Sequence, residues 1–186
     1  MPTLIINPAI EDTFVQSNDD TDKSAATILR SGDFFGATTR AFIRFGLVAA
    51  LPAPPLPVTL ATLSIHVANT NDSTIFIPDG TWVDTDTWTT IAAGVIGGIS
   101  KDFTPGAKGT VNIDVTALVQ SIVDNAYTQE FTIRGRPETE AFQNIDSLES
   151  ANPSFKPSIT VIYPSAEIWL PKHYIHPRLP LIKGKP

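Results

Sequence analysis

The stretch Thr39-Arg-Ala-Phe-Ile-Arg-Phe45 decides the fold class, because apolar side chains recur in it at every second position. In an extended chain, successive side chains point to opposite faces, so Ala41, Ile43 and Phe45 share one face of this stretch. Arg40, Phe42 and Arg44 share the other face. We therefore expect a half-buried β-strand over residues 39–45.

The same alternation recurs along most of the first 163 residues. Strands are predicted over residues 59–67, 111–115, 131–133 and 159–163, with shorter ones over residues 4–6, 13–16, 26–30 and 82–90. Turn-forming Gly, Pro, Asn and Asp residues separate these stretches. Many short strands with such punctuation predict an all-β protein, a jelly-roll-like antiparallel β-sandwich.

One segment has helical periodicity instead. Thr116 is a suitable N-cap for a short helix over residues 117–124, in which Leu118, Val119, Ile122 and Val123 fall on one face. Asp114 is expected to accept backbone N–H bonds in the turn that begins this helix.

Composition restricts the classes of function. The 186 residues include no cysteine, which excludes disulfides, thiolate metal ligands and a thiol nucleophile. The net charge of −6 argues against nucleic acid as a partner. The longest apolar run, residues 45–58, is broken by Gly46 and four prolines, so no membrane crossing is expected. The first eight residues have no basic segment and no long apolar stretch, so no signal peptide is expected.

Charge locates a boundary near residue 163. Residues 1–163 have a charge balance of −9, whereas residues 164–186 have a balance of +3 and five of the sixteen prolines. We expect a sandwich domain over residues 1–163 and an extended C-terminal arm over residues 164–186. The arm is too apolar to remain in water, so we expect it to bind a partner. Its predicted contact residues are Trp169, Leu170, Tyr174, Ile175, Arg178, Leu179, Leu181 and Ile182.

Aromatic residues in the body are candidates for a binding surface. Phe42 would lie exposed between Arg40 and Arg44, a composition enriched at interfaces, unless a second sheet or the arm covers it. Trp82 and Trp88 are candidates for contacts with sugar rings, as are Phe34, Phe35 and Tyr127, although aromatic residues in a sandwich are usually core.

Catalysis has weaker candidates. Asp84 and Asp86 would share a strand face with Trp82 and Trp88, as a pair of glycoside-cleaving carboxylates would, but a solvated strand has the same pattern. The chain has three histidines and no Gly-x-Ser-x-Gly motif, so a hydrolytic triad is not expected. We expect no catalytic residues.

A metal site is considered in one turn. Asn18-Asp-Asp-Thr-Asp22 concentrates oxygen atoms, so Asp19, Asp20 and Asp22 could hold a structural Ca²⁺, but an ordinary acidic turn is the better explanation, because the Gly and terminal Glu of the helix-loop-helix calcium loop are missing. No other cofactor is expected.

The body resembles the DNRLRE family of jelly-roll domains over about its first 163 residues. The residues that carry the resemblance are Asp12-Thr-Phe-Val15, Arg40-Ala-Phe-Ile-Arg-Phe45, Ala61-Thr-Leu-Ser-Ile65, Ile113-Asp-Val-Thr116, Asp146-Ser-Leu-Glu149 and Lys156-Pro-Ser-Ile-Thr-Val-Ile-Tyr163. The resemblance implies a non-catalytic β-sandwich of the kind found in surface and virion proteins and related to carbohydrate-binding modules.

These observations together predict a non-enzymatic structural protein of a larger assembly. The specific expectation is a bacteriophage virion component at the particle surface, either a capsid decoration or cement protein or a tail or fibre subunit. The arm would attach it to other subunits such as a major capsid protein, and a homo-oligomer is expected. The alternative is a carbohydrate-binding module that recognises a glycan through surface aromatics.

Overall fold

The computed structural model describes residues 3–6, 8–51, 57–79, 82–91, 94–127, 130–135 and 142–164. Within them the chain forms eleven strands, two α-helices and one 3-10 helix. The elements are β1 (Thr3–Ile6), β2 (Glu11–Gln16), β3 (Ile28–Phe34), β4 (Ala37–Arg44), α1 (Leu47–Ala50), β5 (Leu60–Val67), β6 (Ser73–Asp79), β7 (Gly94–Phe103), β8 (Gly109–Asp114), α2 (Thr116–Asn125), β9 (Phe131–Gly135), β10 (Phe142–Asp146), η1 (Pro153–Phe155) and β11 (Ser158–Ile162).

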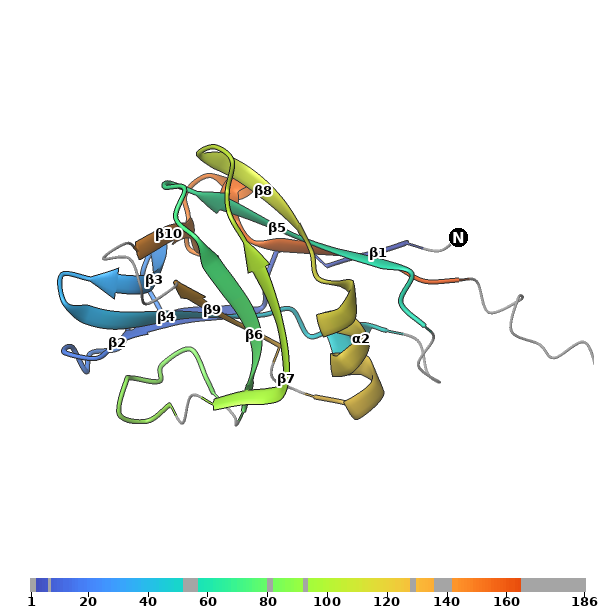
Figure 1. Ribbon diagram of the computed structural model, residues 1–186, viewed down its shortest axis with the longest axis horizontal. Coiled ribbons are helices and arrows are strands. Elements are labelled where there is room, and N and C mark those ends of the chain that lie inside the picture. Colours follow the sequence, from blue (N-terminus) through green and yellow to red (C-terminus); the bar gives the residue numbers. More distant parts are fainter. Residues whose placement is uncertain are drawn as a thin grey trace, which may run out of the picture.

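The strands form one antiparallel sheet that curls into two layers (Figure 1). One layer has the order β8-β5-β11-β1, and the other has the order β2-β4-β9-β6-β7. β3 joins the layers, because residues 28–32 pair with β10 and residues 32–34 pair with β4. β10 in turn meets β5 where Ile145 pairs with Val67. The predicted all-β, sandwich-like architecture is confirmed.

The core lies between the two layers and follows the alternation in the sequence. Ala41, Ile43 and Phe45 are buried on the inner face of the β4 layer, as predicted. On β5, every second side chain from Ala61 to Val67 is buried against them. Burial of one such aliphatic side chain contributes about 1.5–3 kcal/mol, so this alternation determines which face of each strand points inward.

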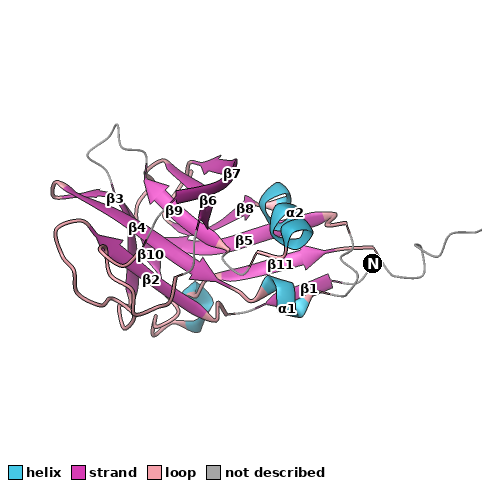
Figure 2. Cartoon of the chain, turned by 90° about the horizontal axis from the view of Figure 1, so that it is seen from below, coloured by secondary structure: helices cyan, strands magenta, loops and turns pink. Residues whose placement is uncertain are grey.

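Helix α2 begins at Thr116, one residue earlier than predicted, and lies next to α1 (Figure 2). The prediction that Thr116 caps the helix is wrong, because its hydroxyl instead accepts the backbone N–H of Ala61 at 2.9 Å. Asp114 accepts the backbone N–H of Thr116 at 3.0 Å, which confirms its predicted role in the turn. Within the described residues, no helix is long and apolar enough to cross a membrane.

Residues 82–90 were predicted to form a strand, and this prediction is wrong. The segment is a loop of successive turns, in which the backbone N–H of Asp86 donates to the Val83 carbonyl at 3.0 Å. Conversely, β6, β7 and β10 were not predicted. β7 contains three glycines, which lower its strand propensity. Its hydrogen-bonded pairing with β6 stabilises it as a strand.

Candidate functional site

The outer face of β4 is covered by the loop of residues 82–91. Phe42 is completely buried there, with its ring centroid 5.5 Å from that of Trp82, and Trp82 is itself buried. Val15 completes this second small core, and Trp88 packs against it. The prediction of an exposed ring at Phe42 is therefore wrong, because the loop of residues 82–91 covers the ring.

The two arginines beside Phe42 stack on the same loop. The Arg44 guanidinium lies 5.2 Å from the centroid of Trp82, and the Arg40 guanidinium lies 5.2 Å from the centroid of Trp88. Arg44 also forms an ion pair with Glu11. The five residues expected to form a binding surface thus contact one another. Phe42 and Trp82 are buried, and Arg40, Arg44 and Trp88 are only partly exposed.

Asp86 fixes the shape of this loop. Asp86 accepts the backbone N–H of Val83 at 2.8 Å and the Thr90 hydroxyl at 2.9 Å. Because residues 82–90 are not a strand, the predicted shared face of Asp84 and Asp86 does not exist.

The acidic turn of residues 18–22 also has structural partners. Lys23 donates to Asp19 at 2.6 Å, Ser24 donates its backbone N–H to Asp22 at 2.7 Å, and Thr89 donates its backbone N–H to Asp20 at 3.0 Å. The pKa of each carboxyl lies below its ordinary value, because Lys23 donates to Asp19 and the Ser24 backbone donates to Asp22. For Asp20 the main cause is hydrogen bonding from the Thr87 side chain, followed by that from Thr89. Across the described residues, no three His, Cys, Asp or Glu side chains gather where they could hold a metal ion. The turn therefore positions loops, and Asp20 joins it to residues 82–91.

His66 lies in a polar cluster on the outer side of β5. Its Nδ1 is 2.7 Å from an oxygen of Asp146, and its ring stacks on Phe155 with centroids 3.7 Å apart. The Ser150 hydroxyl bonds to the other oxygen of Asp146, at 3.2 Å, rather than to the histidine. A nucleophile needs its base as the hydrogen-bond partner, so this arrangement is not a hydrolytic triad.

Two buried carboxylates were not singled out as site residues by the sequence. Glu130 accepts the backbone N–H groups of Phe45 and Leu47, and burial raises its pKa to about 7. Asp12 accepts the backbone N–H of Leu148 at 2.6 Å, and burial raises its pKa to about 8. No local sequence pattern predicts these two residues, because each binds backbone groups that are distant in the sequence. Their hydrogen bonds fix the path of the chain.

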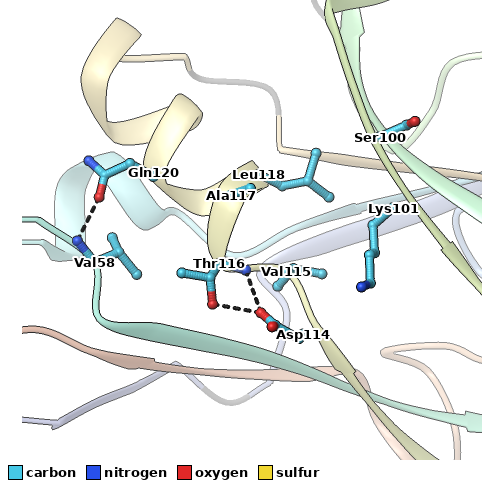
Figure 3. Close-up of a pocket in the computed structure, with 9 residues that line it drawn as sticks. All are labelled: Val58, Ser100, Lys101, Asp114, Val115, Thr116, Ala117, Leu118 and Gln120. Carbon is cyan, nitrogen blue, oxygen red and sulfur yellow. Dashed lines mark hydrogen bonds between the residues drawn. The ribbon is translucent and has the colours of Figure 1, made fainter.

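A cavity of about 430 Å³ lies between β7 and the start of α2 (Figure 3). Lys101 extends from β7 toward the side that holds Asp114, while Leu118 lies toward β7 from α2. Asp114 is engaged by Thr116, and Gln120 accepts the backbone N–H of Val58 at 2.6 Å. The polar groups on the helix side of this cavity therefore hold α2 in place.

The turn between β3 and β4, which we call the tip, carries an exposed aromatic residue. Phe35 is 87% exposed and is the most exposed of the large hydrophobic residues in the described part of the chain. Its ring meets Phe34 edge-on at 4.7 Å, and Phe34 meets Phe142 at 4.8 Å. Asp33 closes the turn by accepting the backbone N–H of Gly36 at 2.8 Å.

The backbone at Phe35 is strained. Phe34 pairs with Ala37, so the turn consists of Phe35 and Gly36, whose φ angles are +51° and +78°. Two-residue hairpins with positive φ at both positions favour Asn-Gly, and a bulky side chain at the first position costs about 1–2 kcal/mol. Phe35 thus occupies a position unfavourable both for its backbone and for its ring.

A cavity of about 300 Å³, which we call the end pocket, lies beyond the other end of β4. It is lined by Arg44, Gly46, Val48, Ala49, Tyr127 and Glu130. Val48 is 41% exposed beside it, and the side chain of Ile10, which is 56% exposed, approaches Gly46. This end of the body therefore presents apolar side chains around a cavity that contains one arginine and one buried carboxylate.

The predicted contact residues of the arm, from Trp169 to Ile182, lie outside the described residues. Comparison with protein-family models and with curated proteins finds no match for this chain.

Proposed function

We propose that this protein is a non-enzymatic structural subunit of a larger assembly, and specifically a bacteriophage virion component. The protein would be either a capsid decoration or cement protein, or a subunit of a tail or fibre. The sandwich serves as a rigid body at the particle surface, and the arm of residues 164–186 attaches it to other subunits such as a major capsid protein.

The observation that carries the proposal is the tip. An apolar ring that is 87% exposed on a strained turn is unfavourable in an isolated molecule, but it is favourable where a partner covers it. The polar candidates for chemistry support the same role, because Asp20, Asp86 and Glu130 hold loops and turns of the body together.

The sequence of the arm supports attachment to a partner. Its charge balance of +3 is opposite to the −9 of the body, and its apolar residues would serve as anchors in a partner's grooves. Prolines reduce the entropy lost when such a segment becomes ordered.

Deletion of residues 164–186 tests this role. The far-UV circular dichroism spectrum should keep its β character, because β11 ends at Ile162, while incorporation into the particle should be lost. A full-length variant with Trp169→Ala and Tyr174→Ala is the matched control for chain length, and it should incorporate poorly. Normal incorporation of the truncated chain would contradict the proposal.

Carbohydrate binding is the second candidate, because the ring of Phe35 is open to solvent as a sugar-stacking residue would be. This function would give retention on a polysaccharide affinity gel that Phe35→Ala weakens. Trp88→Ala should have a smaller effect, since Trp88 is partly covered.

A further inference from the structure

We propose that copies of this chain associate head to tail, with Phe35 of one copy inserted into the end pocket of the next. This inference rests on the proposed structural role and names one of its contacts. The contact would join the tip of one copy to the end pocket of the next, and both of these regions present apolar groups next to charged ones.

The tip has the properties of an inserted contact residue. Phe35 combines an unfavourable backbone conformation with an exposed ring, and an Asn at this position would relieve both. Phe34 packs edge-on against Phe35 and is itself packed on Phe142, and the Phe35 ring remains 87% exposed. A residue that is unfavourable in the isolated molecule indicates a contact that compensates for it.

The end pocket has the size and chemistry to receive this ring. A cavity of about 300 Å³ accommodates a phenyl group, and Val48, Ala49 and Tyr127 offer it apolar contacts. Val48 is exposed at the cavity and would be covered by the incoming tip. Arg44 lines the pocket but already pairs with Glu11, so the contact rests on the apolar groups and on the fit of the ring.

The placement of the two features makes the association head to tail. Phe35 precedes β4 and the end pocket follows it, so eight strand residues, about 26 Å, separate them within one copy. Figure 2 shows β3 and α1 well separated along the molecule. Phe35 therefore cannot fill the pocket of its own chain. A surface that binds a different surface of its neighbour builds rings or filaments, which suits a repeated subunit.

The geometry favours a protein contact over a glycan at the tip. Successive sugar rings stack on flat aromatic surfaces, whereas Phe34 is tilted by 72° to Phe35 and by 84° to Phe142. One oxygen of Asp33 already accepts the Gly36 N–H and is less available to a sugar hydroxyl.

Cysteine cross-linking of the full chain tests the contact, since the native sequence contains no cysteine. Thr38 is exposed on β4 next to the tip, so a cysteine there leaves the Phe35 ring in place. An equimolar mixture of Thr38→Cys and Val48→Cys chains, one carrying a mass tag, should form disulfide-linked heterodimers at least tenfold faster than either variant forms homodimers. A mixture of Thr38→Cys and Val83→Cys is the control, because Val83 is exposed to a similar degree as Val48, at 48%, on a different loop. Heterodimers no faster than this control, or Thr38→Cys homodimers in excess, would overturn the proposal.

The Phe35→Asn variant separates association from folding. Sedimentation of the full chain at high concentration should show self-association weakened by about 30-fold or more, the effect of losing one buried aromatic contact. Its resistance to urea should be equal or higher, because Asn-Gly suits the turn. Unchanged self-association, with loss of glycan retention instead, would overturn the proposal in favour of a sugar site. The two proposals can fail separately. If the native chain is incorporated into a particle but the cysteine mixture does not cross-link, this contact is refuted, whereas the proposed role of the arm is not.

Discussion

Glu130 shows how a single residue relates the stability of this protein to pH. Burial raises its pKa from 4.5 to about 7, so the folded chain holds this proton more tightly than the unfolded chain. Its contribution to stability is therefore complete below about pH 4.5 and is lost as the pH rises through about 7. We expect Glu130→Gln, which cannot ionise, to gain about 3 kcal/mol relative to the native chain between pH 5 and pH 8. Urea unfolding of both chains at several pH values measures this, and a difference that does not change with pH would contradict it.

Asp12 is a second buried carboxyl whose contribution to stability falls as the pH rises, but its hydrogen bonds differ from those of Glu130. Burial raises its pKa from 3.8 to about 8, so the stability that its neutral form contributes is lost as the pH rises through about 8. One oxygen accepts the Leu148 N–H, and the other is buried without a hydrogen-bond partner. Asp12→Asn keeps the acceptor and removes the charge, so we expect it to be more stable than the native chain at pH 9 by at least about 1 kcal/mol. The same urea titration tests this, and destabilisation at pH 9 would refute it.

At the scale of elements, the loop of residues 82–91 acts as an outer cover for β4. Trp82 provides most of the contact, because it is buried against Phe42, whereas Trp88 is only partly buried. We expect Trp82→Ala to lower the free energy of unfolding by about 3 kcal/mol and Trp88→Ala by about 1 kcal/mol. Denaturant midpoints measure both changes, and equal effects of the two substitutions would show that the loop does not cover β4 in this way.

At the scale of the whole molecule, the two layers share one core. Ile43 of one layer and Leu63 of the other belong to the same buried cluster, and β3 is hydrogen-bonded to both layers. We expect the body to unfold in one cooperative transition, so far-UV circular dichroism and tryptophan fluorescence should give the same urea midpoint. A Trp169→Phe background restricts the fluorescence signal to Trp82 and Trp88. Two separated midpoints would indicate that the layers unfold independently.

Local alternation predicted β4 and β5 correctly, because each strand buries one face against the same core. The same alternation wrongly predicted a strand over residues 82–90, because Trp82 and Trp88 of this loop pack onto β4 instead of forming part of a sheet. Part of the candidate site was also visible in the sequence, because Phe35 was among the aromatic residues considered for a binding surface. The end pocket was not, since its lining comes from residues 44–49 and from Tyr127 and Glu130, about 80 positions later.

The sequence by itself determined an antiparallel all-β body with the helix after Asp114, because period-two and helical patterns and turn residues act over a few neighbouring positions. Only the tertiary structure decided which aromatic residues are covered and which are exposed. Phe42 and Phe35 have the same side chain, yet one is buried beneath Trp82 and the other protrudes from a turn. The burial of Asp12 and Glu130 was also decided at this level, because burial depends on contacts between segments more than 80 residues apart.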